Sequence, residues 1–196
     1  MRIIAGQAGG RRIRVPATGT RPSSDRLREA MFASIESRLV AQGRSWSDIA
    51  VCDLWAGSGA LALEAWSRGT RRAVAVDKSK AAIDTIARNI CELGALGVRA
   101  ERADVSILLA AAPRDDPFDL VFADPPYDTD DDSIRRDLAA ALRMGWWREG
   151  ALIVIERRAG SENPFPDGIE SLAERNYGDS MLWYGRVVDG REERPL

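Results

Sequence analysis

The tetrapeptide DPPY, Asp124 to Tyr127, follows directly on the apolar run FDLVFA. That run predicts a buried strand, and two consecutive prolines predict a rigid loop with no backbone N–H to donate. The Asp124 carboxylate and the Pro125 carbonyl can there accept both hydrogens of an amino group, with Pro126 holding the backbone rigid. The Tyr127 ring can stack on a flat base. The tetrapeptide is therefore a candidate site for chemistry at an exocyclic amine, with an ordinary tight turn as the alternative.

A glycine loop, Gly57-Ser58-Gly59, lies between a predicted strand at residues 49–56 and a predicted helix. Glycine lets a backbone pass close to a ligand where a Cβ would collide. A glycine loop between a strand and a helix therefore indicates a ligand-binding site. Gly57, Gly59 and Ala62 also satisfy the dinucleotide fingerprint, so NAD is a competing ligand. Asp53, four residues before Gly57, would face a pyrophosphate unfavourably but suits an ammonium group.

Acidic residues close three of the predicted strands, in register with this loop. Asp77 can accept hydrogen bonds from both hydroxyls of a ribose, and Asp104, with the backbone beside Val105, can reach an adenine amino group. Each acid could instead only cap a helix. Ribose, adenine, ammonium and carboxylate occur together in S-adenosylmethionine, which matches the acids better than NAD does. The predicted cofactor residues are Asp53, Gly57, Ser58, Gly59, Asp77, Lys78, Asp104 and Val105.

Strand and helix patterns alternate from residue 50 onward, which predicts an α/β fold. The strands are near-continuous apolar runs, so the sheet should be mostly parallel and covered on both faces. The segments IESLAERNYG and SMLWYGRVV predict a C-terminal antiparallel hairpin. Residues 1–15, with glycines at the turn, predict a small N-terminal β-hairpin, and residues 25–40 predict a helix. Ligands bind at the carboxyl ends of such strands, where the loop, the acids and DPPY all fall.

The composition narrows the chemistry further. A chain of 196 residues that is 45% hydrophobic suits one compact domain with a small appendage. No apolar stretch approaches the roughly 18 residues of a membrane span, and the N-terminus is unlike a signal peptide, so we expect a cytoplasmic protein. Histidine is absent, which removes histidine bases and most zinc sites, and no metal is expected. Cys52 and Cys91 lie in apolar segments and are expected to be reduced core thiols.

Positive charge is concentrated at the N-terminus. Residues 1–28 hold seven arginines and one acid, a local charge of +6 on a chain whose net charge is −2. A basic arm on an acidic body indicates a polyanionic partner, whose phosphates the arginines would contact without reading bases. A solvated or salt-bridged arm without a partner is the alternative. The candidate phosphate-contacting residues are Arg11, Arg12 and Arg14 on the hairpin and Arg21, Arg26 and Arg28 at the first helix.

The glycine loop, the acid after the second strand and the DPPY tetrapeptide resemble class I S-adenosylmethionine-dependent amino-methyltransferases. The segments IIAGQAGGRRIRVP, TRPSSDRLREAMFASI and DLWAGSGALALEAWSRG resemble, in order and spacing, the RsmD family of bacterial small-subunit rRNA guanine-N2 methyltransferases. The resemblance covers nearly the whole chain, and TRPSSDRLREAMF is its most specific part. Trp55 stands where phenylalanine is usual in the family, and Tyr127 where some members have phenylalanine.

The resemblance implies an RNA-binding arm over residues 1–20 and a Rossmann-like class I methyltransferase domain over residues 21–196. It implies S-adenosylmethionine as cofactor and one methyl group transferred to N2 of a guanine in 16S rRNA, within the small ribosomal subunit or its assembly intermediate. We expect a monomer that meets this large particle with one active face. The remaining alternatives are a DNA adenine-N6 methyltransferase, an NAD-binding oxidoreductase and a non-catalytic ribosome-assembly protein. The DNA alternative is weakened because the chain has no room for a sizeable target-recognition domain.

Overall fold

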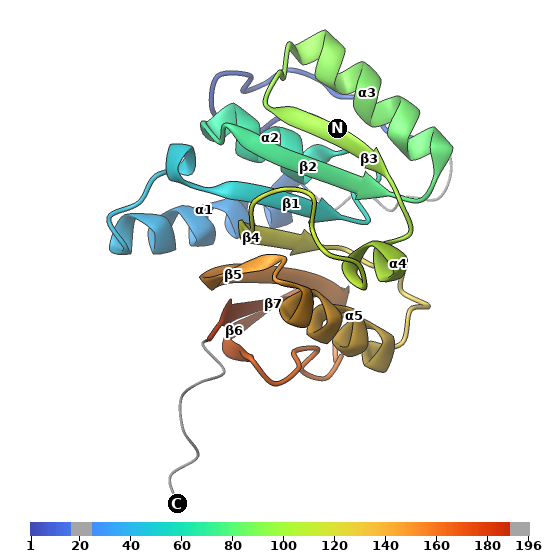
Figure 1. The fold of residues 1–196 in the computed structure, drawn as a ribbon. Helices are drawn as coiled ribbons and strands as arrows, with labels where there is room; N and C mark the ends of the chain where they lie inside the picture. The colour runs from blue at the N-terminus through green and yellow to red at the C-terminus, as the bar shows by residue number, and fades with distance from the viewer. Residues whose placement is uncertain (17–24, 189–196) are drawn as a thin grey trace, which may run out of the picture.

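The computed structural model describes residues 1–16 and 25–188, which form a twisted seven-stranded sheet with helices on both faces (Figure 1). The strands are β1 (Ala50–Leu54), β2 (Arg72–Asp77), β3 (Val98–Arg102), β4 (Phe118–Ala123), β5 (Trp147–Arg158), β6 (Ile169–Tyr177) and β7 (Ser180–Val187). The helices are α1 (Asp25–Ala41), the 3-10 turn η1 (Trp46–Asp48), α2 (Ala60–Arg68), α3 (Lys80–Leu93), α4 (Val105–Leu109) and α5 (Asp131–Met144). No helix in these two ranges is long and apolar enough to cross a bilayer.

The strand order is β3-β2-β1-β4-β5-β7-β6. The first five strands pair in parallel, and β7 runs antiparallel to both of its neighbours, which confirms the predicted sheet and its C-terminal hairpin. From β1 the chain moves outward to β3 and then returns to β4 on the other side of β1. The carboxyl ends of β1 and β4 therefore flank the switch point of the sheet, where ligands bind in such folds.

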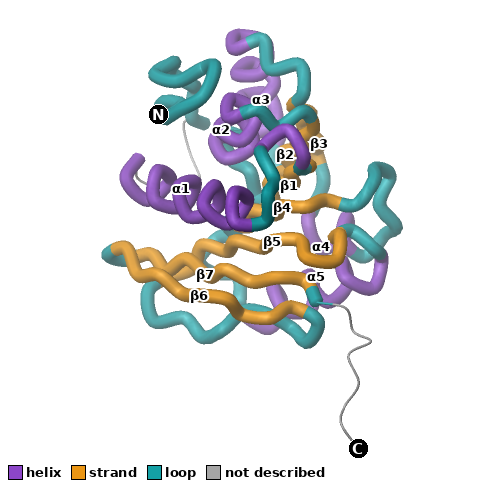
Figure 2. The backbone as a smooth tube through the Cα atoms, turned by 90° about the vertical axis from the view of Figure 1, so that its left-hand side faces the viewer, coloured by secondary structure: helices purple, strands orange, loops and turns teal. Residues whose placement is uncertain are grey.

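Two apolar cores lie on the two faces of the sheet. Helices α1, α2 and α3 cover one face, and α4 and α5 cover the other (Figures 1 and 2). Helix α1 shows why the sequence forms this layer: Leu27, Met31 and Ile35 recur at helical spacing and are all buried. Phe32 of the same helix packs on Phe122 of β4 with ring centroids 5.4 Å apart, which places α1 over the centre of the sheet.

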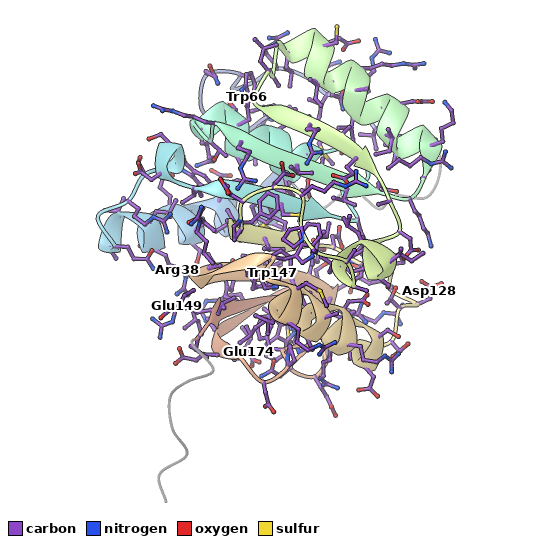
Figure 3. The ribbon with its side chains drawn as sticks, in the orientation of Figure 1. Arg38, Trp66, Asp128, Trp147, Glu149 and Glu174 are labelled. Carbon is purple, nitrogen blue, oxygen red and sulfur yellow. The ribbon has the colours of Figure 1, made fainter. Side chains whose placement is uncertain are left out.

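Most large apolar side chains lie inside the molecule and most charged side chains lie on its surface (Figure 3). Trp147 lies in the interior at 6% exposure, whereas Glu149, two residues later on β5, is exposed at the periphery. Both cysteines are free thiols. Cys52 is buried, as expected, but the prediction of a core position for Cys91 is wrong. Helix α3 turns the side that carries Ile86 toward the sheet, and Cys91 points away from it.

The N-terminal hairpin is less regular than its sequence predicts. Its two limbs run antiparallel, but they share only one β-bridge, between Arg2 and Arg12. Ile3 donates to the carbonyl of Arg11 at 2.9 Å, and the Ile3 and Ile13 side chains are buried. Buried backbone N–H groups must find acceptors, and in the segment between the limbs several of them find theirs on α2 instead of on the opposite limb.

Helix α2 holds this segment through two side chains. The Glu64 carboxylate accepts from the backbone N–H groups of Ile4 at 2.7 Å and Ala5 at 3.1 Å, and the Ser67 hydroxyl accepts from Ala8 N–H at 2.9 Å. Gly6, with φ +81°, approaches so closely that a Cβ there would lie 1.9 Å from the Ser67 carbonyl oxygen. Residues 1–16 are therefore docked on the sheet domain, and the predicted boundary at residue 20 lies outside the described residues.

Candidate active site

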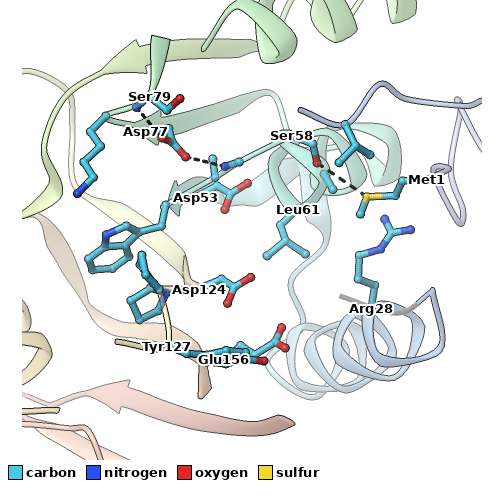
Figure 4. Close-up of a pocket in the computed structure, with 18 residues that line it drawn as sticks. Met1, Arg28, Asp53, Ser58, Leu61, Asp77, Ser79, Asp124, Tyr127 and Glu156 are labelled. Carbon is cyan, nitrogen blue, oxygen red and sulfur yellow. Dashed lines mark hydrogen bonds between the residues drawn. The ribbon is translucent and has the colours of Figure 1, made fainter. Parts of the chain in front are cut away.

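A cavity of about 390 Å³ opens at the carboxyl ends of β1, β2 and β4, below the first turn of α2 (Figure 4). It is closed on one side by α1 and by residues 1 and 15 of the N-terminal segment. The sequence-predicted residues that line it are Asp53, Gly57, Ser58, Asp77, Lys78, Asp124, Pro125, Pro126 and Tyr127, together with Arg28. The glycine loop and DPPY, predicted as separate candidate sites, thus share one space.

The backbone of the glycine loop is tightly wound. Gly57 has φ 56° and Gly59 φ 75°, values that suit glycine, but Trp55 also adopts φ 55°. A left-handed conformation costs a residue with a Cβ about 1–2 kcal/mol, and such strain gathers at functional sites. Asp77 holds the loop in place: one carboxylate oxygen accepts from Gly57 N–H at 2.9 Å and the other from Ser79 N–H at 2.8 Å. Each oxygen keeps a further lone pair for a ligand hydroxyl.

Asp53 is buried at 1% exposure and faces both α2 and the cavity. Gly59, at the N-cap of α2, has no side chain to satisfy the first helical N–H groups, and Asp53 accepts from Ala62 N–H at 3.0 Å instead. Helix capping, the alternative role for this acid, is therefore present. Burial raises the pKa of Asp53 well above its ordinary value, the Ala62 N–H opposes this, and the charges of Asp124 and Asp77 raise it further. A cation in the cavity would relieve this repulsion.

The DPPY segment begins where β4 leaves the sheet, with Asp124 N–H 3.4 Å from the Leu54 carbonyl of β1. The Pro126 carbonyl accepts from Thr129 N–H at 2.9 Å and from the buried Arg157 at 3.5 Å. No described residue donates a hydrogen bond to the Pro125 carbonyl. The segment is thus anchored through Pro126, while the Asp124 carboxylate and the Pro125 carbonyl remain as acceptors.

Glu156, which sequence reasoning missed, lies beside Asp124 in the cavity at 6% exposure (Figure 4). It accepts from the Ser180 hydroxyl at 2.8 Å, and that hydroxyl lies 3.3 Å from the Tyr127 hydroxyl. Burial and the nearby Glu156 charge raise the pKa of Asp124, against the Arg157 charge, which lowers it. The Arg158 guanidinium lies 5.5 Å from the centroid of the Tyr127 ring.

The signal for Glu156 was present in the sequence. It ends the apolar run ALIVI, in the same position relative to its strand as the acids after the first three strands.

Three predicted cofactor residues do not line the cavity. Asp104 caps α4, accepting from Ser106 N–H at 3.1 Å and Ile107 N–H at 3.4 Å. Val105, the first residue of α4, is buried in the core, and Gly59 packs its backbone against Ile86.

The predicted RNA-binding arginines are scattered. Arg11 donates to the carbonyl of Leu93 at 3.3 Å, and Arg14 pairs with Glu92 at 2.7 Å, so both bind the end of α3. Arg12 and Arg26 are exposed. Arg28 is buried in the cavity wall. Arg21 lies outside the described residues.

A family described as conserved hypothetical protein 95 matches residues 1–186. The chain is 33% identical over 172 residues to ribosomal RNA small subunit methyltransferase D of Escherichia coli K12, covering 85% of this chain and 78% of that protein. It is 37% identical over 130 residues to the putative rRNA methyltransferase YlbH of Bacillus subtilis, covering 65% of this chain and 67% of that protein.

Solved structures agree with these sequence relatives. The putative methyltransferase yhhF from Escherichia coli superposes with a TM-score of 0.76 at 29% identity, covering 96% of this chain and 98% of that one. A hypothetical protein of Thermus thermophilus superposes with a TM-score of 0.77 at 31% identity, covering 94% and 98%. The sheet order, the shared cavity and these matches lead to one assignment: the chain belongs to the RsmD family of class I methyltransferases.

Proposed function

We propose that this protein transfers a methyl group from S-adenosylmethionine to the exocyclic N2 of a guanine in 16S rRNA, within the small ribosomal subunit or its assembly intermediate. The observation that carries the proposal is the single cavity in which the glycine loop with its acids meets the DPPY segment. The name of the Escherichia coli relative, which specifies small-subunit ribosomal RNA, supports the substrate class.

The charge of the cavity supports the cofactor. Asp53, Asp77, Asp124 and Glu156 all line it, and the pKa values of Asp53 and Asp124 are raised. A ligand with cationic centres would stabilise these carboxylates, and S-adenosylmethionine has a sulfonium and an ammonium. The volume of about 390 Å³ falls in the ordinary range for small-molecule sites.

The residues around the cavity have distinct proposed roles in cofactor binding. When bound, S-adenosylmethionine supplies an electrophilic methyl group. Asp53 would hold the ammonium, and Asp77 the ribose hydroxyls above the glycine loop. Asp104 and the backbone of Val105 follow β3 next to the end of β2 and lie outside the cavity lining, and they are proposed to hold the adenine where it extends beyond the cavity.

The DPPY segment would prepare the target amine. The lone pair of an exocyclic amine is delocalised into the base, so the amine is a poor nucleophile. If the Asp124 carboxylate and the Pro125 carbonyl accept hydrogen bonds from its two N–H groups, the lone pair of the amine becomes localised and directed at the methyl group. Tyr127 would stack on the base, and the cation–π contact with Arg158 would hold the Tyr127 ring in place. No strong general base is needed, because the methylated cationic amine loses its proton readily.

The exposed arginines would position the rRNA. Arg12 and Arg26 face solvent and are free to meet phosphates, whereas Arg11 and Arg14 would have to contact RNA while bound to the end of α3. Phosphate contacts fix register and do not read sequence. Selection of one guanine would then depend on the cavity and on the shape of the surrounding particle.

The proposal is tested by incubating the protein with methyl-labelled S-adenosylmethionine and under-methylated small subunits. We expect label in N2-methylguanine of 16S rRNA. Asp124→Ala should lower the rate at least ~100-fold, the scale for removing one group that acts in a transition state, and leave cofactor affinity nearly unchanged. Asp128→Ala is the matched control, because Asp128 is exposed in the same loop (Figure 3), and its rate should stay within about twofold of wild type.

Two results would contradict the proposal. Label in DNA and none in rRNA would favour the DNA adenine alternative, and tighter calorimetric binding of NAD than of S-adenosylmethionine would favour an oxidoreductase. If Asp124→Ala transfers methyl groups at the wild-type rate, the role given to Asp124 is wrong.

A further inference from the structure

Arg28 is the most deeply buried cation of the cavity wall. It extends from α1 toward Met1 and the first turn of α2, and its side chain is 1% exposed (Figure 4). Arginine is almost never fully buried unless it is paired, because removing a charge from water is costly. The pairing of Arg28 therefore indicates whether its own surroundings explain its burial.

The described surroundings satisfy only one of its three nitrogens. Nη2 donates to the Arg2 carbonyl at 2.7 Å and to the Asp25 carboxylate at 2.8 Å. Asp25 is half exposed, and Arg28 lowers its pKa. Nε and Nη1, with three N–H donors between them, are buried and have no acceptor among the described residues. A buried donor without an acceptor costs its full desolvation penalty, so this end of the cavity is incomplete as it stands.

The cavity is also electrically asymmetric. Four carboxylates extend from the sheet side, those of Asp53, Asp77, Asp124 and Glu156, and Arg28 faces them from α1 (Figure 4). A ligand that suits this arrangement carries positive charge in its middle and one anionic group at the end near α1. The amino-acid portion of S-adenosylmethionine has this pattern, with a sulfonium, an ammonium and a single α-carboxylate.

We propose that Arg28 binds the α-carboxylate of the cofactor through Nε and Nη1. This inference rests on the proposed function, and it gives Arg28 a different role from the RNA contact expected from its sequence position. An RNA phosphate is bulky and needs an open approach, which the exposed Arg26 offers and the buried Arg28 does not.

The Met1 side chain must move before a ligand carboxylate can reach Arg28. Met1 lies beside the guanidinium, and its sulfur is held by a 3.8 Å contact from the Ser58 hydroxyl (Figure 4). A thioether is a weak acceptor on a flexible chain. Its displacement would open Nε and Nη1 to the ligand and release the Ser58 hydroxyl to donate to the same carboxylate.

The test measures ligand binding by calorimetry and does not depend on RNA. The ligands are S-adenosylhomocysteine and its aminopropyl analogue, which keeps the ammonium and lacks only the carboxylate. For Arg28→Gln we expect binding of S-adenosylhomocysteine to weaken about 10- to 100-fold, the range for hydrogen bonds to charged groups. Binding of the analogue should change less than about twofold, because the lost interaction requires the carboxylate.

Two further variants separate this role from a structural one. Arg26→Gln, on the exposed side of the same helix, should leave both affinities unchanged. Arg28→Lys keeps the charge with fewer donors and should restore part of the affinity for S-adenosylhomocysteine alone. It also carries the test if the glutamine variant does not fold.

The outcomes that overturn the proposal are distinct. An equal loss for both ligands would assign Arg28 to the fold alone. Unchanged affinity for S-adenosylhomocysteine with slower methylation of small subunits would assign it to RNA. If the wild-type protein binds neither ligand, the proposed function itself fails, and the role of Arg28 fails with it.

Discussion

Replacement of Glu64 by alanine should release the N-terminal segment from the sheet domain. Glu64 is 0% exposed, accepts from Ile4 and Ala5 N–H groups, and pairs with Arg68 at 2.9 Å. The alanine variant leaves two backbone donors without an acceptor, at about 1–3 kcal/mol each. Arg68 keeps its ion pair with Glu36 at 3.0 Å. We therefore expect the free energy of unfolding to fall by about 3–5 kcal/mol, the range for breaking a buried pair by removing one partner.

Detachment of the N-terminal segment from the sheet domain sets an upper limit on this loss of unfolding free energy. If the segment leaves the domain, water satisfies the N–H groups of Ile4 and Ala5, and the cost becomes the lost burial of neighbours such as Ile3, which is fully buried. Burial of one isoleucine side chain contributes about 1.5–3 kcal/mol. Detachment therefore costs about as much as leaving the donors unpaired, and the variant should exchange these amide hydrogens freely while the sheet stays protected.

Urea unfolding and amide hydrogen exchange measure the two effects. Glu36→Ala is the control, because Glu36 is a half-exposed partner of the same arginine and its ion pair contributes at most about 1 kcal/mol. Since the Arg2 carbonyl of this segment holds the Arg28 guanidinium at 2.7 Å, Glu64→Ala should also weaken binding of S-adenosylhomocysteine, and Glu36→Ala should not. The reasoning is refuted if both variants lose the same stability and the Ile4 amide stays protected in Glu64→Ala.

Two further predictions concern the acids of the cavity. Because burial and the Glu156 charge raise the pKa of Asp124, Asp124 becomes protonated at a higher pH than an ordinary aspartate does. Glu156→Gln should therefore move the acid limb of the pH–rate profile of methylation to lower pH. An acid limb that does not move would contradict this. The folded-state pKa of Asp53 is also raised, so ionisation of this buried carboxyl destabilises the fold. Asp53→Asn keeps an acceptor for Ala62 N–H. At pH values above the folded-state pKa of Asp53, this variant should therefore raise the melting temperature of the ligand-free protein. This gain should vanish below the ordinary aspartate pKa of about 3.9, and cofactor affinity should fall; a gain that persists in acid would contradict the assignment.

The sequence predicted the parts of the site that depend on local chemistry. The glycine loop and DPPY each carry their own signal, because glycine and proline act on the backbone where they stand. Their meeting in one cavity followed from a topological rule, since β1 and β4 are neighbours at the switch point. Ser180, the hydroxyl partner of Glu156, could not be predicted because it lies on β7 two residues from Leu182, the residue opposite Glu156, and packing sets the register of this antiparallel pairing.

Charge was the least informative signal, because a count of arginines does not distinguish an external partner from an internal one. Arg14 illustrates this: its side chain pairs with Glu92, and its backbone carbonyl accepts from the buried amide of Asn89 at 3.0 Å. The same amide nitrogen donates to the Ser58 carbonyl of the glycine loop at 3.0 Å. The N-terminal segment and the loop are therefore held by one side chain, and a displacement of either changes the hydrogen bonds of the other. Asn89 therefore connects the segment that carries Arg12, a proposed rRNA contact, to the loop that lines the cavity. Its polarity on the buried face of α3 is the sequence signal for this role.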